Sequence, residues 1–211
     1  RYARDVYRAV QRYRKTTRSV ACHPEFREYF VHYPIKKSKY SSHFYAMSMV
    51  GANQAVLDLG CGEGFFAREL KKNGNEVTGV DVLRKEVPPE GLTDYFSADL
   101  DAGITHLIPR LKEGRFSRIL LLDVLEHLRR PEELLAQCSQ LMQPESELII
   151  SLPNVANITV RLQLLFGLFN YTERGILDKT HLRFFTRRTA RQLIKDAGFR
   201  IALERTTVMP I

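Results

Sequence analysis

Three closely spaced glycines and two acidic residues are the part of this sequence best suited to chemistry. Gly60, Gly62 and Gly64 follow Asp58 in the run LDLGCGEG, and Asp81 comes 21 residues after Gly60. Glycine has no Cβ, so a glycine loop lets the backbone pass close to a ligand. A carboxylate at the distance of Asp81 is typical of folds in which it accepts hydrogen bonds from both hydroxyls of a ribose. The pattern therefore predicts a ligand that contains a nucleoside.

The glycine spacing excludes two common classes of nucleotide site. A dinucleotide fingerprint, G-x-G-x-x-G, needs its third glycine at position 65, where this chain has Phe65. A triphosphate-binding loop needs a Gly-Lys-Ser/Thr sequence, and none follows. What remains is G-x-G-x-G after an acid.

Two later segments carry polar residues that suit a ligand site or a proton transfer. Ala98-Asp99-Leu100 is expected at the end of a third strand, and Asp123-Val-Leu-Glu-His127 after a fourth. Ligands of open α/β sheets bind at the carboxyl ends of the strands, where these residues should meet. Histidine, with an ordinary pKa of about 6.5, is a natural base at neutral pH. His127 and His181 are therefore the candidate catalytic residues, and a purely structural role is the alternative for each.

Together these motifs resemble those of the class I S-adenosylmethionine-dependent methyltransferases, whose first motif has the form hhDhGCGxG. The resemblance covers about residues 50–206. It implies a Rossmann-like domain that binds S-adenosylmethionine and releases S-adenosylhomocysteine. The cofactor-binding residues that it implies are Asp58, Gly60, Cys61, Gly62, Gly64, Asp81, Val82, Asp99, Leu100 and Asp123. Within this set it places Asp81 at the ribose, Asp99 and Leu100 at the adenine, and Asp123 near the methionine end. A Rossmann-like domain with a different or inactive nucleotide site is the alternative.

A closer resemblance is to the ubiquinone-biosynthesis-type O-methyltransferases and related bacterial enzymes. It is carried by the D-x-L-E-H segment and by a long connection over about residues 153–186, which it identifies as a lid insertion. It implies O-methylation of a small-molecule, glycan or lipid-linked acceptor. The apolar run 158–169, interrupted by Arg161 and Gln163, suits a lid or an interfacial helix in peripheral contact with a membrane. A buried core helix is the alternative.

Small-RNA 2′-O-methyltransferases provide another resemblance. They bind a divalent metal through E-x-x-E-H and a later histidine, and this chain has Asp123, Glu126, His127 and His181 at comparable positions. Aspartate at position 123 is one methylene shorter than glutamate, so the favoured interpretation assigns no metal. An RNA or tRNA methyltransferase is therefore one alternative function. A non-catalytic module that binds S-adenosylmethionine is another.

The net charge of +8 is concentrated at the N-terminus. Residues 1–40 hold eleven Lys or Arg and three Asp or Glu, whereas the rest of the chain is balanced. Such a block can bind nucleic acid or an anionic membrane surface. We favour a solvated helix over about residues 3–17 with Val6, Val10 and Tyr13 on its apolar face. Nucleic acid is thus a possible partner but not the favoured one.

The elements that must position these residues alternate between strands and helices, which predicts a doubly wound, mostly parallel α/β sheet. Strands are expected over 55–59, 77–82, 118–122, 147–152 and 199–206, and helices over 42–49, 65–73, 131–141 and 189–197. The expected organisation is a basic helical extension (1–49) and a methyltransferase domain (50–211).

Three unpatterned cysteines, Cys22, Cys61 and Cys138, and no apolar run of membrane-spanning length indicate a cytoplasmic protein without a signal peptide. The chain starts at Arg1 without methionine, which is compatible with a piece of a longer protein, and its oligomeric state is left open.

Overall fold

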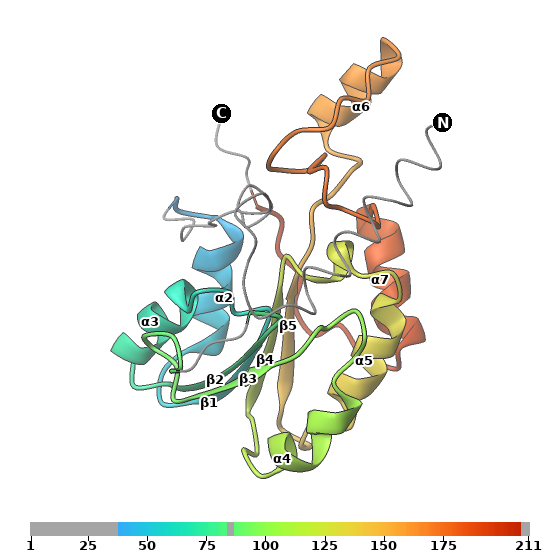
Figure 1. The fold of residues 1–211 in the computed structure, drawn as a ribbon. Helices are drawn as coiled ribbons and strands as arrows, with labels where there is room; N and C mark the ends of the chain where they lie inside the picture. Colours follow the sequence, from blue (N-terminus) through green and yellow to red (C-terminus); the bar gives the residue numbers. More distant parts are fainter. Residues whose placement is uncertain (1–37, 84–86, 208–211) are drawn as a thin grey trace. The chain divides into compact units, whose positions relative to one another are not determined.

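The computed structural model describes residues 38–83 and 87–207, and it contains a five-stranded, wholly parallel sheet (Figure 1). The strands follow the order β3-β2-β1-β4-β5 across the sheet. Their bounds are β1 Ala55–Leu59, β2 Glu76–Asp81, β3 Asp94–Ser97, β4 Arg118–Leu122 and β5 Glu147–Ser151. The predicted doubly wound α/β fold is confirmed, and four of the five predicted strands lie within one residue of their expected bounds.

Each central strand is apolar on both faces, as a sheet covered by helices requires. Val56 of β1 packs with one group of helices, whereas its neighbour Leu57 packs with the other. In β4, Leu120 and Leu121 alternate in the same way, and all four side chains are fully buried.

Two layers of helices cover the sheet. They are formed by α2 Ser42–Val50, α3 Phe65–Lys72, α4 Ile108–Lys112, α5 Pro131–Ser139 and α7 Arg187–Asp196, whereas α6 Ile158–Leu165 belongs to neither core cluster. Side chains of α2 and α3 share one core cluster with the sheet, and those of α4, α5 and α7 share the other. Figure 1 shows these two groups on opposite faces. Through Ala46 and Val50, α2 contributes to the core at the end of the expected N-terminal extension.

Local sequence explains where the helices begin. Pro131 stands in the first turn of α5, where its missing N–H costs no hydrogen bond. Thr186 caps α7 by accepting a hydrogen bond from the N–H of Thr189, whose hydroxyl in turn accepts one from the N–H of Thr186. Gly64 precedes α3 in the left-handed conformation, with φ of 77°. A loop of this shape turns the chain sharply from β1 into α3.

The strand order reverses beside β1, because β2 and β3 lie on one side of it and β4 and β5 on the other. Such a switch point opens a crevice at the carboxyl ends of the strands, where α/β proteins bind their ligands. The glycine loop follows β1 and the D-x-L-E-H segment follows β4. Both sets of candidate residues therefore reach the same edge of the sheet.

The predicted insertion after β5 forms a segment of its own. Asn154 and Phe185 form an isolated bridge at its base, and the N–H of Val155 donates to the carbonyl of Phe185 at 2.8 Å. Beyond this base α6 projects from the carboxyl edge of the sheet (Figure 1). Within the described residues, no helix has the length and apolar character needed to cross a membrane.

One predicted strand is not found, and one predicted helix cannot be compared with the structure. Residues 199–206 form no strand in the described structure, and the expectation of one there is wrong. Instead of pairing with the sheet, this segment meets α7 through Glu204, which binds both Arg187 and Arg191. The helix expected over residues 3–17 lies outside the described residues.

Candidate functional site

The glycine loop after β1 has a backbone that only glycine adopts easily. Gly60 and Gly62 have φ angles of 87° and 55°, in the left-handed region. A Cβ on Gly60 would lie 2.6 Å from Cγ2 of Val124, so any side chain there would collide with the segment after β4. A Cβ on Gly62 would meet nothing within 4 Å and would project into open space. The backbone of the loop is therefore open to a ligand at Gly62.

Asp81 is held at the end of β2 by two backbone N–H groups. The N–H of Gly62 donates to Oδ2 at 2.8 Å, and the N–H of Leu83 donates to Oδ1 at 3.1 Å. The next strand is fixed to the same residue, because the N–H of Ala98 donates to the carbonyl of Asp81 at 2.8 Å. Each carboxylate oxygen keeps a further lone pair, so Asp81 is a rigid acceptor for the hydroxyls of a ligand.

Asp58, in β1, differs from Asp81 because its side chain is only 3% exposed. Burial, together with the nearby charge of Asp81, raises the pKa of its carboxyl to about 7. Burial and the charges of the same two acids also raise the pKa of the Cys61 thiol, so Cys61 packs as a small neutral group. Two carboxyl groups beside one loop favour a ligand with positive charge.

Three further residues expected at the cofactor lie along the ends of β2 and β3, two of them, Asp99 and Leu100, at its adenine. Val82 is 39% exposed directly after Asp81. Asp99 is exposed, and its Oδ1 accepts a hydrogen bond from the N–H of Asp101 at 3.0 Å. Leu100, next in the chain, packs against the core cluster that contains α4 and α5. The structure thus places Val82, Asp99 and Leu100 on the same edge as Asp81.

Asp123 directly follows β4 and has a left-handed backbone, φ 55°, that is uncommon for a residue with a side chain. Ser151, at the end of β5, holds it there. The Ser151 hydroxyl donates to Oδ1 of Asp123 at 2.6 Å and accepts from its N–H at 2.9 Å. A residue with a strained backbone that two hydrogen bonds hold at a ligand-binding edge is typical of functional sites.

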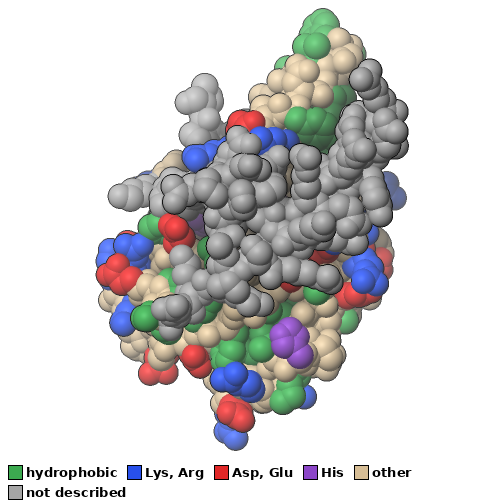
Figure 2. All heavy atoms as spheres, in the orientation of Figure 1, with side chains coloured by type: hydrophobic (Ala, Val, Ile, Leu, Met, Phe, Trp, Pro, Cys, Tyr) green, Lys and Arg blue, Asp and Glu red, His purple; other side chains and the backbone are tan. Residues whose placement is uncertain are grey.

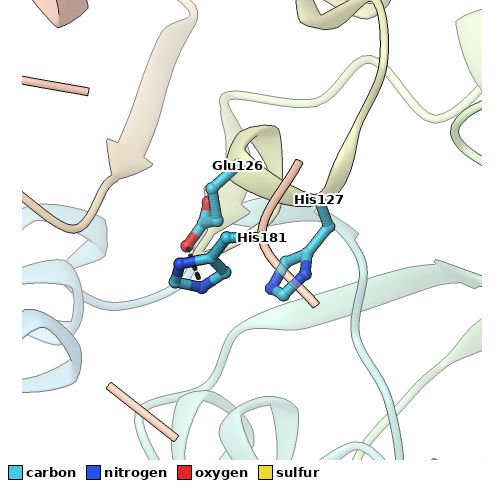
Figure 3. Close-up of side chains that lie close together, drawn as sticks. All are labelled: Glu126, His127 and His181. Atoms are coloured by element: carbon cyan, nitrogen blue, oxygen red, sulfur yellow. Dashed lines mark ion pairs between the residues drawn. The ribbon is translucent and has the colours of Figure 1, made fainter. Parts of the chain in front are cut away.

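The D-x-L-E-H segment and the second histidine are brought together by backbone hydrogen bonds. The N–H groups of Leu182 and Arg183 donate to the carbonyl of Glu126 at 2.8 and 3.0 Å. As a result, the ring centroids of His127 and His181 lie 4.9 Å apart (Figure 3). Nε2 of His181 is 4.0 Å from Oε1 of Glu126, which is 1% exposed.

One ligand atom from each of Glu126, His127 and His181 lies within 4.8 Å of the others, as in a site able to hold a metal ion. Carboxylate and imidazole ligands together suit several divalent metals. Asp123, the fourth residue of the metal alternative, is not in this group. It is bonded to Ser151 instead.

The pKa of His127 is lowered, chiefly by burial and next by the neighbouring His181. The Thr180 carbonyl and the charges of Asp178 and Asp123 act in the opposite direction but do not cancel it. A lowered pKa favours the neutral imidazole of His127, which has a lone pair with which to accept a proton.

Three residues of this region were missed by the sequence interpretation: Ser151, Asp178 and Thr180. Asp178 is 2% exposed and Thr180 connects it to His127. A buried acid three residues before His181 in the run DKTH was the available signal. No periodicity or spacing indicated that Ser151 would hold Asp123, because the two residues meet only through the pairing of β4 with β5.

Comparisons with known proteins agree with this geometry. A family model described as a methyltransferase domain matches residues 12–204. The chain belongs to the class I S-adenosylmethionine-dependent methyltransferases. A methyltransferase described as dependent on S-adenosylmethionine, from Archaeoglobus fulgidus, has 26% sequence identity and a TM-score of 0.51, and the match covers 74% of this chain and 65% of that one.

Two other similar proteins are informative. The ubiquinone biosynthesis O-methyltransferase of Nitrosococcus oceani is 33% identical over 111 residues, which are 49% of this chain and 45% of that protein. This chain thus spans about half the length of the curated relatives that it matches. The magnesium protoporphyrin IX methyltransferase of Synechocystis, solved with bound S-adenosylhomocysteine, shares the fold with a TM-score of 0.51 at 22% identity, over 78% of this chain and 72% of that one.

The residues of this methyltransferase fit its cofactor, S-adenosylmethionine. Asp81 offers fixed acceptors of the kind that two ribose hydroxyls need. Asp58 adds a buried carboxyl beside the same loop, which suits a cofactor that carries a sulfonium and an ammonium group. The open space beside Gly62 leaves room for the ligand to approach the backbone.

Proposed function

We propose that this methyltransferase transfers a methyl group to a hydroxyl oxygen and that His127 removes the proton of that hydroxyl. The observation that carries the proposal is the position of His127, which lies beside His181 and three residues after Val124, the residue packed against Gly60 of the glycine loop. Burial also lowers the pKa of His127, which favours the form that can accept a proton. The Nitrosococcus oceani relative is an O-methyltransferase by name, which supports the same chemistry.

The protein has little to supply beyond alignment and a base. S-Adenosylmethionine, when bound, provides a methyl group that is already electrophilic. Asp81 and the glycine loop would fix the nucleoside, and Asp58 would face the cationic part of the cofactor. Holding two reactants in line can contribute up to roughly 7 to 11 kcal/mol. An alcohol or phenol must also lose its proton, and general-base catalysis by His127 meets that need. His181 would orient His127 or serve as the second base.

We propose a small-molecule, glycan or lipid-linked acceptor covered by the segment around α6. Leu165 and Phe166 of this segment are both 76% exposed. Figure 2 shows apolar side chains at the surface of this projecting segment. A lid of this composition suits an acceptor with an apolar part. Peripheral contact with a membrane would bring a lipid-linked acceptor to the same segment.

The test is methyl transfer from radiolabelled S-adenosylmethionine to a panel of probes: a soluble catechol, a hexose, a polyprenyl-linked sugar and a short single-stranded RNA. We expect label in a hydroxyl-bearing small or lipid-linked probe, with mass spectrometry placing the methyl on oxygen. Methylation on nitrogen alone would contradict the proposal.

RNA 2′-O-methylation assisted by a divalent metal is a second candidate function, favoured by one observation. Glu126, His127 and His181 place their ligand atoms within 4.8 Å of one another. In that case EDTA would abolish transfer to RNA by the unmutated protein, and added Mg²⁺ or Mn²⁺ would restore it. If transfer to the small hydroxyl probe proceeds unchanged in EDTA, the metal-assisted candidate is excluded for that reaction.

A further inference from the structure

The contacts of Nδ1 of His127 indicate which ring nitrogen carries the hydrogen. Nδ1 of His127 lies 3.3 Å from the carbonyl oxygen of Thr180 and 3.2 Å from its hydroxyl oxygen. A carbonyl oxygen can only accept, so the hydrogen of this contact must be on Nδ1.

Asp178 decides the role of the Thr180 hydroxyl. The hydroxyl donates its single proton to Oδ1 of Asp178 at 2.7 Å, and the N–H of Thr180 donates to the same oxygen at 2.8 Å. With its proton committed to Asp178, the hydroxyl can only accept from His127. Both neighbours of Nδ1 are therefore acceptors.

We infer that Asp178 and Thr180 are positioning residues that hold His127 in the tautomer with hydrogen on Nδ1, so that Nε2 presents the lone pair to the acceptor hydroxyl. The inference rests on the proposed function for its catalytic meaning. The tautomer itself follows from the contacts of these three residues. An acid that fixes the tautomer of a catalytic histidine is a known way to make the imidazole an effective base.

His181 is held in the same sense by a different contact. Its Nδ1 lies 3.1 Å from the carbonyl oxygen of Ile176, so Nδ1 donates there and Nε2 faces Glu126. The segment 176–181 thus fixes both imidazoles. Asp178 lies at its centre, in a bridge with Thr172 that closes the base of the loop.

Nitrogen NMR on the full chain labelled with ¹⁵N-histidine tests the tautomer without any acceptor. The chain has six histidines, and comparison with His127→Ala identifies the ring signals of His127. At pH 8 we expect protonated, pyrrole-type Nδ1 and unprotonated, pyridine-type Nε2. Hydrogen on Nε2 of His127 in the unmutated protein would overturn the inference.

Thr180→Val tests the origin of the tautomer, because valine keeps the shape of threonine and removes the hydroxyl. We expect the His127 signals to move toward a mixture of tautomers in Thr180→Val and to stay in place in Thr180→Ser. The matched control is Thr93→Val at the opposite edge of the sheet, where threonine is exposed. Unchanged His127 signals in a folded Thr180→Val protein would show that Asp178 and the Thr180 hydroxyl do not set the tautomer.

Turnover then separates this inference from the proposed function. With the hydroxyl probe that supports methyl transfer, Thr180→Val should lower kcat by about tenfold, the value of one hydrogen bond, and leave the KM for S-adenosylmethionine unchanged. Thr180→Ser should restore the rate. An unchanged kcat in Thr180→Val, with the tautomer disturbed, would refute the positioning role. Full activity of His127→Ala would instead refute the proposed base, and the measured tautomer would stand.

Discussion

At the scale of single residues, two neighbouring acids have different environments and different roles. Asp81 accepts two backbone hydrogen bonds and is fixed at the end of β2. Asp58 is buried beside it, and its carboxyl has a pKa raised to about 7 by burial first and by Asp81 second. The first residue is therefore suited to neutral hydroxyl groups, and the second to a ligand whose positive charge offsets its own ionisation.

Replacement of Asp81 should weaken cofactor binding more than replacement of any other single side chain, because we expect Asp81 to provide the acceptors for both ribose hydroxyls. Calorimetry on Asp81→Ala should show an affinity for S-adenosylmethionine at least about tenfold lower, or about 1.4 kcal/mol. Asp94→Ala, at the exposed opposite end of β3, is the control and should bind normally. Unchanged affinity in Asp81→Ala would argue against this placement of the ribose.

Asp58 should make the cofactor-free protein less stable as the pH rises. Its pKa is higher in the folded protein than in the unfolded chain, so its contribution is complete below about pH 4 and is lost as the pH rises through about 7. Between pH 5 and pH 8, the unfolding free energy of the wild type should fall by roughly 2 to 3 kcal/mol more than that of Asp58→Asn. Urea titration at the two pH values measures this difference, with Asp94→Asn as control. Parallel losses in all three proteins would show that Asp58 is not perturbed.

At the scale of elements, α6 and the loop after it contribute little to the hydrophobic core, so their role is not to stabilise the fold. Of α6, only Val160 is buried. The following apolar residues, among them Phe166 and Leu168, are exposed. Large exposed apolar groups in a cluster usually mark a site of interaction. The same segment reaches the candidate site through Phe169, whose ring contacts Phe184, and Phe184 in turn contacts His181.

Polar substitution in this segment should change acceptor binding and little else. For Phe166→Ser we expect an unfolding free energy within about 0.5 kcal/mol of the wild type, because the side chain is already 76% exposed. The affinity for S-adenosylmethionine should also be unchanged, whereas the KM for an apolar acceptor should rise several-fold. Val87→Ser, at a position that is 74% exposed outside this segment, is the matched control. Equal KM values for the two variants would show that the segment around α6 does not contact the acceptor.

The elements themselves were largely predictable, because their signals are local. Apolar runs located β1, β4 and β5, and Thr186 indicated the start of α7. The error at residues 199–206 has a non-local cause. The run is apolar enough for a strand, but Glu204 within it pairs with Arg187 and Arg191 on α7, an interaction that no spacing in the sequence indicates.

At the scale of the whole molecule, the sheet topology gathers the site from five separate segments. Placing β1 between β2 and β4 brings the glycine loop, Asp81 and the D-x-L-E-H segment to one edge of the sheet. This convergence was predictable from the fold class. The contact between His127 and His181 was indicated only by the resemblance to the small-RNA 2′-O-methyltransferases, since it depends on how the chain returns over the edge after the insertion. For the same reason, the sequence did not indicate that Asp178 and Thr180 would lie beside His127.

The most direct test of the account is the pH dependence of methyl transfer by the wild type, His127→Ala and His106→Ala. His106, an exposed residue of the short helix before α4, is the control and should leave the rate unchanged. Burial lowers the pKa of His127, so the wild-type kcat should rise as the pH passes a value below 6.5 and be level at neutral pH. His127→Ala should lose this dependence and lower kcat by roughly 10² to 10⁴, with its affinity for S-adenosylmethionine intact. A His127→Ala protein with the wild-type rate and pH profile would contradict the account.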